Sequence, residues 1–285
     1  MTNITKKTIN FRGQLLTLDK PLVMGIVNVT PDSFFDGGKY TYEQAIVERV
    51  REILDQGGTI IDVGAYSSRP GADDIPETEE IQRLDKALSA IRKEFPDVII
   101  SVDTFRPAVA KHVLENYNVQ MINDIMGGGD DFIMYEVVAK YDVPYVMMHI
   151  KGTPQTMQNN PHYDDLMQEM IMFFSRRLDR LRKTYVRDVI LDPGFGFGKT
   201  LEHNYELMNK LEYFKNLFDE PLLVGVSRKS MIFRLLGTTP AEALNGTTVL
   251  NTIALLKGAD ILRVHDVREA VEAITIVEKM KLSER

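Results

Sequence analysis

Short apolar segments rich in valine and isoleucine recur along the whole chain, separated by longer segments with helical periodicity. Strands that are covered on both faces read as nearly continuous apolar runs, so each short segment predicts a buried strand. The eight predicted strands are Val23–Val27, Ile60–Val63, Val98–Val102, Val119–Ile122, Pro144–Met148, Asp188–Leu191, Leu222–Val226 and Ile261–Val264. Because each is followed by a helical connection, the pattern predicts a parallel sheet of the α/β class.

The segments between the strands have the spacing of amphipathic helices. In Tyr42–Gln56, the side chains of Ile46, Val50 and Ile53 fall on one face of a helix with 3.6 residues per turn. Helices are expected in the same way over Glu77–Lys93, over Asp164–Lys183 and from Pro107 to Asn116.

Eight strand–helix units are most simply arranged as a closed (β/α)8 TIM barrel, because closure leaves no sheet edge exposed. An open, doubly wound sheet is the alternative. The opening segment TINFRGQLLTL predicts an N-terminal β-hairpin around Arg12 and Gly13, which we expect to cap the lower end of the barrel. We expect residues 1–285 to form one domain, with residues 1–20 as the hairpin extension.

Composition and charge exclude several classes of protein. The chain has no cysteine, which removes disulfides, thiol catalysis and cysteine-ligated metal centres. Its formal net charge is −7 without a lysine- or arginine-rich block, so nucleic acid is not an expected partner. Neither a membrane span nor a signal-peptide core is found, and a cytoplasmic protein is expected.

Polar residues follow the predicted strands at or just past their C-terminal ends, where a barrel gathers them around one mouth. They include Asn28, Asp62, Asp103, Asn123, His149, Asp192, Lys229, Arg263 and His265. Carboxylate and amide oxygens accept hydrogen bonds from a flat, N–H-rich ligand edge, whereas the cations suit phosphate. The predicted pocket therefore fits a ligand with a planar N–H-rich end and an anionic end.

Two connections, residues 29–40 and 64–76, are longer than usual and are expected to bind ligand. Asn28 and Asp36 near the first of them offer few oxygens for a metal, so only a water-rich Mg²⁺ held mainly by substrate phosphate is expected there. The segment GFGFGKT is not a phosphate-binding P-loop, because Pro193 occupies the position of its first glycine.

Seven motifs in order closely resemble those of the bacterial dihydropteroate synthase family, from about residue 22 to 280. They are MGIVNVTPDSFFDGG, GAYSSRPGA, SVDTFRPAVA, INDI, DPGFGFGKT, GVSRKSMI and RVHDV. The resemblance implies a (β/α)8 barrel and a transferase of folate biosynthesis. That family joins 6-hydroxymethyl-7,8-dihydropterin pyrophosphate to p-aminobenzoate and releases pyrophosphate.

The resemblance also implies roles for individual residues. Asp103, Asn123, Asp192 and Lys229 correspond to the pterin-binding set, and Asn28, Arg263 and His265 to the pyrophosphate site with Mg²⁺, to which Asp36 adds through water. Asp103, Lys229, Arg263 and His265 correspond to the catalytic residues. The p-aminobenzoate side corresponds to Ser68, Arg69, Pro70, Phe197 and Ser230.

Some positions depart from the family pattern, and other enzymes share the pterin-binding barrel. Ala65, Tyr66 and Ser68 stand where Gly, Glu and Thr are usual, and Phe35 where Ser is common. These departures concern arylamine affinity and susceptibility to sulfonamides. A methyltransferase acting on methyltetrahydrofolate and a corrinoid, and a catalytically silent pterin-binding module, are the competing functions. The resemblance implies a homodimer.

Overall fold

The computed structural model of the protein describes residues 8–30, 42–67 and 74–283, and its centre is an eight-stranded parallel sheet. The strands lie in the order β8-β7-β6-β5-β4-β3-β10-β9. They are β3 (Leu22–Asn28), β4 (Ile60–Gly64), β5 (Ile99–Asp103), β6 (Met121–Asp124), β7 (Tyr145–Met148), β8 (Val189–Asp192), β9 (Leu223–Val224) and β10 (Ile261–Val264).

The sheet closes between its first and last strands. The backbone N–H of Leu191 in β8 donates to the carbonyl of Pro221 at 2.8 Å, and Leu191 forms a parallel bridge with Leu222, just before β9. This short connection turns the sheet into a nearly closed barrel. The predicted (β/α)8 barrel is thereby confirmed, and the open sheet is excluded.

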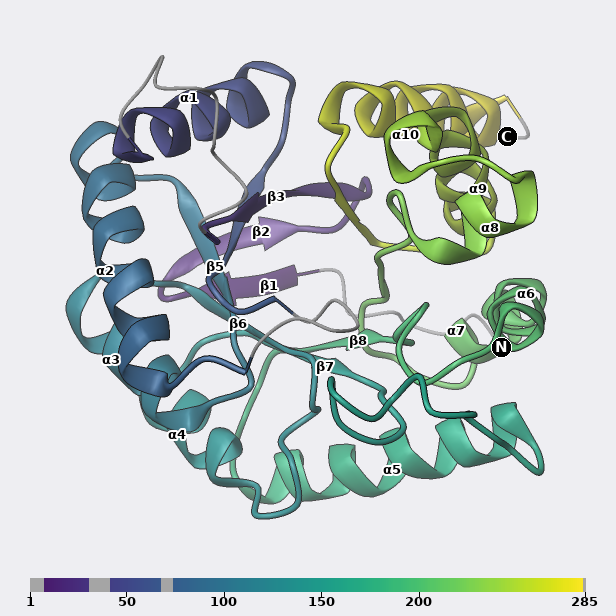
Figure 1. Ribbon diagram of the computed structural model, residues 1–285, viewed down its shortest axis with the longest axis horizontal. Coiled ribbons are helices and arrows are strands. Elements are labelled where there is room, and N and C mark those ends of the chain that lie inside the picture. Colours follow the sequence, from purple (N-terminus) through teal and green to yellow (C-terminus); the bar gives the residue numbers. More distant parts are fainter. Residues whose placement is uncertain (1–7, 31–41, 68–73, 284–285) are drawn as a thin grey trace.

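Helices surround the strands and cover their outer faces (Figure 1). They are α1 (Tyr42–Asp55), α2 (Glu77–Glu94), α3 (Pro107–Asn116), α4 (Ile133–Tyr141), α5 (Leu166–Lys183), α6 (Leu201–Asn209), α7 (Leu211–Lys215), α8 (Ser230–Leu236), α9 (Leu244–Leu256) and α10 (Val267–Leu282). The main apolar core lies between this layer and the sheet, and it includes the predicted buried face of α1, Ile46, Val50 and Ile53.

An antiparallel hairpin of β1 (Thr8–Phe11) and β2 (Gln14–Thr17) precedes the barrel. Arg12 and Gly13 between them both have positive φ, 51° and 96°, as a two-residue turn of type I′ requires. Ile9 and Phe11 are buried against the first inward-facing residues of the strands, at the N-terminal end of the barrel. The expected hairpin cap is therefore confirmed, and it seals the floor.

Most predicted strands match the observed ones within a few residues, but the predicted strand Leu222–Val226 is wrong in extent. Only Leu223 and Val224 form the ladder of β9, and Leu222 adds a single bridge to Leu191, although all five residues are buried. An apolar segment predicts that its residues are buried, but buried residues need not pair as a strand. In the part of the chain that the structure describes, no helix is both long enough and apolar enough to cross a membrane.

Candidate active site

Asp62 lies at the centre of a polar cluster inside the upper half of the barrel. Its Oδ2 atom accepts from Arg263 Nε on β10 at 2.7 Å and from Asn123 Nδ2 on β6 at 3.0 Å. Arg263 Nη2 in turn donates to Asp103 Oδ2 at the end of β5, also at 2.7 Å. Three strands on different sides of Asp62 thus bring together Asp103, Asn123 and Arg263.

Burial and ion pairing shift the pKa values of Asp103 and Arg263 in this cluster. Burial raises the pKa of Asp103 to about 7, although the guanidinium of Arg263 opposes that shift. Burial alone would lower the pKa of Arg263, but the carboxylates of Asp62 and Asp103 have the larger effect and raise it above its ordinary value. Arg263 therefore stays charged, whereas Asp103 exchanges its proton near neutral pH.

A second polar group stands beside the first, on β8 and the segment after β9. Asp192 Oδ1 accepts from the backbone N–H of Gly194 at 2.8 Å, and Lys229 Nζ donates to the carbonyl of Phe195 at 2.5 Å. A Cβ atom at Gly225 would lie 3.9 Å from Lys229 Nζ and 3.7 Å from Arg263 Cβ. The two cations thus flank the same stretch of backbone, and the two polar groups form one site.

Burial shifts both titratable groups of the second set toward neutrality. It raises the pKa of Asp192, against the attraction of Lys229, and lowers the pKa of Lys229 to about 8, against the attraction of Asp192. A ligand that hydrogen-bonds to the carboxylate and accepts from the ammonium would favour the charged form of each.

Several buried acceptors in this cluster have no partner among the residues that the structure describes. They are Asp62 Oδ1 and Asn123 Oδ1. The hydroxyl of Ser101, which is opposite Asp62 in the ladder of β4 and β5, is also unpaired and can donate as well as accept. Buried polar atoms are costly to leave unpaired. These oxygens therefore indicate a ligand that presents several N–H groups.

An apolar group adjoins the polar cluster. Ile125, Met148, Ile150 and Met157 are buried together, and Phe105, Met126 and Phe197 pack against them. Met148 is the residue opposite Asp192 in the ladder between β7 and β8. A flat ring bonded along its edge by the carboxylates would have its faces covered by such side chains.

The predicted arylamine residues are only partly described. Phe197 has its ring 4.6 Å from Lys229 Nζ, a cation–π arrangement, and Ser230 is the first residue of α8, directly after Lys229. These two residues therefore adjoin the pterin set. Ser68, Arg69 and Pro70 lie outside the described residues.

Tyr66, which departs from the family pattern, contacts several elements of the barrel mouth. Its ring packs edge-on against Phe105 with centroids 5.1 Å apart, and Arg106 lies over it at 5.1 Å. Its hydroxyl donates to Asp74 at 3.2 Å and accepts from Gln155 at 2.5 Å. Tyr66 therefore joins the loops that follow β4 and β7.

His265 lies beside Arg263 at the end of β10. Burial, together with the charge of Arg263, lowers its pKa to about 4, so the imidazole is neutral near pH 7. The role predicted for His265 toward pyrophosphate stays a prediction, and without ligand its ring adds no positive charge there. Ser227 Oγ accepts from the His265 backbone N–H and lies 3.1 Å from Nδ1, to which its own proton can donate.

The residues available for Mg²⁺ are few. Asn28 ends β3 and is half-buried, and Asp36 lies outside the described residues. The described residues contain no group of three or more His, Cys, Asp or Glu side chains able to hold a metal. A single amide oxygen is too few for a protein cage and would suit only an ion that keeps its waters, so the expected Mg²⁺ stays a prediction.

Asp62, expected at a strand end among the polar residues of the mouth, lies in the middle of β4 with its side chain fully buried. A charged residue within an otherwise apolar run is the sequence signal for such a position. The apolar group around Met148 leaves no comparable signal, because methionine is ordinary in cores.

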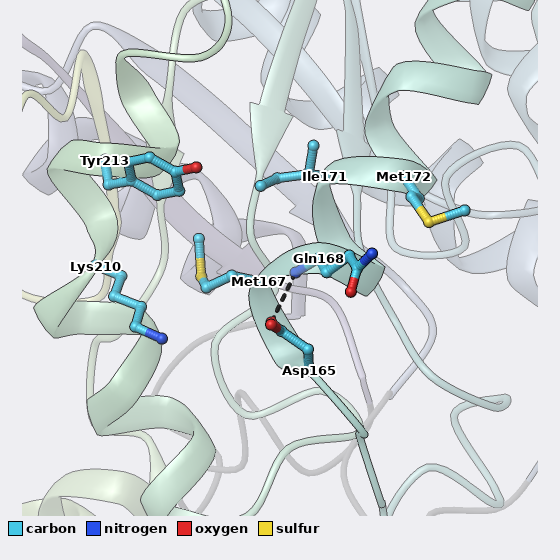
Figure 2. A pocket seen from close by; sticks show the side chains of 7 residues that line it. All are labelled: Asp165, Met167, Gln168, Ile171, Met172, Lys210 and Tyr213. Carbon is cyan, nitrogen blue, oxygen red and sulfur yellow. Dashed lines mark hydrogen bonds between the residues drawn. The ribbon is translucent and has the colours of Figure 1, made fainter.

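A separate pocket lies on the outside of the helical layer, between α5 and the junction of α6 with α7 (Figure 2). It is lined by Asp165, Met167, Gln168, Ile171, Met172, Lys210 and Tyr213. Asp165 caps α5 by accepting from the Gln168 backbone N–H at 2.9 Å. None of the predicted site residues lines this pocket.

Comparison with known proteins shows which family this chain belongs to. The family model described as pterin binding enzyme matches residues 24–265. A dihydropteroate synthase of Escherichia coli is 44% identical over 269 residues, which cover 94% of each chain. This chain belongs to the dihydropteroate synthase family. The family resemblance noted from its motifs is thereby confirmed, and with it the class of transferases.

Solved dihydropteroate synthases have the same fold. A Yersinia pestis enzyme in complex with a sulfonamide drug matches with a TM-score of 0.89 and 41% identity, over 96% of this chain and 99% of that one. A Xanthomonas albilineans enzyme with 4-aminobenzoic acid also matches with a TM-score of 0.89, at 35% identity, over 97% and 99%.

Proposed function

We propose that this chain joins 6-hydroxymethyl-7,8-dihydropterin pyrophosphate to p-aminobenzoate, giving 7,8-dihydropteroate and pyrophosphate. The observation that carries the proposal is the set of buried acceptors around Asp62, Asn123, Asp103 and Asp192, which suits the N–H-rich edge of a pterin. The 4-aminobenzoic acid bound by the Xanthomonas albilineans relative supports the second substrate.

In this proposal the pterin lies across the barrel mouth. Asp192, already oriented by Gly194, accepts from the ring N–H and 2-amino groups, and Asn123 bonds to another ring edge. Lys229 donates to the pterin carbonyl and ring nitrogen. Burial raises the pKa of Asp192 and lowers that of Lys229, so binding of this polar edge favours the charged form of each group and forms charge-assisted hydrogen bonds.

The diphosphate group extends toward Arg263, His265 and Asn28. Arg263 supplies positive charge, and the neutral imidazole of His265 would donate a hydrogen bond from its ring N–H. Asn28, with Asp36 through water, would hold Mg²⁺, which when bound neutralises the diphosphate as a leaving group. p-Aminobenzoate lies beside Phe197 and Ser230, with Ser68, Arg69 and Pro70 as further contacts.

The reaction breaks the bond between the pterin methylene carbon and the diphosphate oxygen, and the electron pair leaves with diphosphate. The cation left on the methylene is delocalised into the dihydropterin ring, where the carboxylate of Asp103 stabilises it. The amine lone pair of p-aminobenzoate then forms the new C–N bond, and the amine loses a proton to water. An arylamine is weakly basic, so no strong general base is needed.

The test is one incubation of the chain with dihydropterin pyrophosphate, p-aminobenzoate and Mg²⁺, in which pyrophosphate and dihydropteroate are measured together. We expect both products in equal amounts. Pterin binding without release of pyrophosphate would instead support a silent binding module. Loss of methyl from methyltetrahydrofolate to a corrinoid protein would support a methyltransferase.

We also propose that the chain forms a homodimer through α9 and α10, neighbouring helices at the upper right of Figure 1. Val249 and Leu256 on α9 and Ile276 and Met280 on α10 are exposed large apolar side chains. An exposed apolar patch of this kind favours association. Light scattering on the parent and on Ile276→Glu tests this, and a dimer in the parent that becomes a monomer in the variant is the expected result.

A further inference from the structure

The loop after β8 contains a buried lysine that the proposed reaction does not use. Lys199 belongs to the DPGFGFGKT motif, and only 3% of its surface is exposed. Lysine is almost never buried to this degree unless its ammonium group is fully bonded. No carboxylate in the described part of the chain lies within ion-pair distance of Lys199 Nζ.

The three donors of this ammonium group are used by neutral acceptors. Nζ lies 2.9 Å from His149 Nδ1, at the end of β7, and donates to the carbonyls of Gly194 at 3.0 Å and Phe197 at 3.2 Å. Burial, together with the charge of Lys199, lowers the pKa of His149 well below its usual range. His149 is therefore neutral and accepts from Lys199. Through these three bonds, Lys199 cross-links His149 to the backbone of Gly194 and Phe197 in the loop after β8.

His149 is itself held in place by aromatic side chains. Its ring packs edge-on against Phe173 on α5, with centroids 4.9 Å apart, and lies 6.2 Å from the ring of Tyr163. The loop also presses directly on β7: Gly194 has φ of +71°, and a Cβ there would come within 2.0 Å of the His149 carbonyl. The anchor of the cross-link is thus fixed by close packing.

The opposite side of the same loop contacts the pterin set. The Gly194 N–H orients Asp192, the Phe195 carbonyl accepts from Lys229, and the Phe197 ring lies under Lys229 Nζ. The carbonyls that Lys199 holds belong to residues 194 and 197, which bracket these contacts. A shift of the loop would therefore move the partners of both Asp192 and Lys229.

We propose that Lys199 is a positioning residue of the active site, which uses His149 as its anchor to hold the loop that orients Asp192, Lys229 and Phe197. This inference rests on the proposed function, since it assigns those residues to the pterin and the arylamine. Lys199 contacts neither substrate and takes no proton in the reaction. Its effect reaches the ligands only through the geometry of residues 194–197.

Lys199→Met tests the proposal, with Lys215→Met as the matched control. Lys215 is also largely buried and bonds to the Glu220 carbonyl and Asp260, near the start of β9 at the lower end of the barrel. Binding of 6-hydroxymethylpterin is measured by calorimetry, and KM for p-aminobenzoate and kcat by release of pyrophosphate. We expect Lys199→Met to weaken the pterin and to raise KM at least about tenfold, the loss of one or two hydrogen bonds.

A merely structural role predicts a different outcome, because loss of folded protein lowers the active fraction and leaves KM and the dissociation constant unchanged. Lys215→Met is expected to behave in that way, with values within about twofold of the parent. If Lys199→Met does the same, the inference is overturned. A parent that binds no pterin would overturn the proposed function first.

Two variants of His149 test the positioning role of Lys199 if Lys199→Met does not fold. His149→Leu removes the acceptor of Lys199, whereas His149→Gln keeps an oxygen for it. We expect His149→Leu to weaken pterin binding severalfold and His149→Gln to recover a large part of that loss. Equal affinity in the two variants would contradict the proposal.

Discussion

Arg263 and Asp62 form the central ion pair of the barrel mouth, with Nε and Oδ2 2.7 Å apart and the Asp62 side chain fully buried. Asp103 shares the same guanidinium at 2.7 Å. One arginine therefore balances two carboxylates that line the proposed pterin site. Removing one member of such a buried group leaves the others uncompensated, at a cost of about 3–5 kcal/mol.

The first prediction concerns Arg263→Lys, which keeps the charge but loses the planar fork. An ammonium cannot reproduce the geometry that bonds Asp62 and Asp103 together, so we expect turnover to fall at least about 100-fold. Release of pyrophosphate at saturating substrates measures this. Arg92→Lys is the control, because the Arg92 guanidinium also makes several hydrogen bonds, to carbonyls that include those of Tyr117 and Val98, but near the lower end of the barrel. An Arg263→Lys variant as active as the control would contradict the assignment of Arg263.

The second prediction concerns Asp192→Ala. The carboxylate is expected to accept at least two N–H groups of the pterin, and hydrogen bonds to charged groups contribute about 1.5–3 kcal/mol each. We therefore expect pterin affinity to fall about 100-fold or more in calorimetry. Asp188→Ala removes a carboxylate just before the same strand, where it accepts from Asn10, and should leave that affinity unchanged. Comparable affinity in Asp192→Ala and the parent would refute the assignment.

The third prediction is a bell-shaped pH dependence of pterin binding. The pKa of Asp103 is raised to about 7 and that of Lys229 is lowered to about 8, so the doubly charged site is most populated between the two values. Affinity should fall at lower pH as Asp103 gains a proton, and at higher pH as Lys229 loses one. In Asp103→Asn the acidic limb should disappear while the alkaline limb stays. An unchanged acidic limb in that variant would assign it to another group.

The fourth prediction concerns the hairpin that caps the barrel. Phe11→Ala leaves a cavity in the floor and should lower the free energy of unfolding by about 3–5 kcal/mol. Leu15 on β2 is 67% exposed, so Leu15→Ala should change stability by less than about 0.5 kcal/mol. Chemical denaturation measures both. Because the floor is remote from the mouth, KM for both substrates should stay at the parent value in each variant.

The fifth prediction separates the metal from the pterin site. Chelation of Mg²⁺ should lower turnover and weaken dihydropterin pyrophosphate, because the ion is expected to bind mainly to diphosphate. It should not change the affinity for 6-hydroxymethylpterin, which has no phosphate. An equal loss of affinity for both ligands would place the metal at the ring instead.

The sequence predicts the barrel well because strands that are covered on both faces leave a simple apolar signature. The predicted strand Ile261–Val264 and the predicted helix from Pro107 to Asn116 coincide with β10 and α3. The short extent of β9 was not predictable, since its neighbours are equally apolar and equally buried. Hydrogen-bonded pairing of this strand depends on where the barrel closes, and the hydrophobicity of a short segment gives no information about that.

The chemistry of the site was predictable only as a set of residue types. The position of Asp62 inside the barrel, and its bonds to Asn123 and Arg263, come from three strands far apart in the chain. The neutral state of His265 arises from burial beside Arg263, which no spacing reveals. The sequence predicts His149 among the polar residues of the mouth, whereas its ring contacts Lys199 and the ring of Phe173.

The plug formed by Ile9 and Phe11 has a consequence for the order of events at the site. With the floor filled, ligands are expected to enter and leave by the upper mouth alone. Asn123 and Asp192 of the pterin set are more buried than Phe197 and Ser230, so in the proposed complex an arylamine that arrived first would stand in the path of the pterin. In the proposed reaction the heterocycle is therefore expected to load before the arylamine, and product dissociation to clear the passage before the next cycle begins.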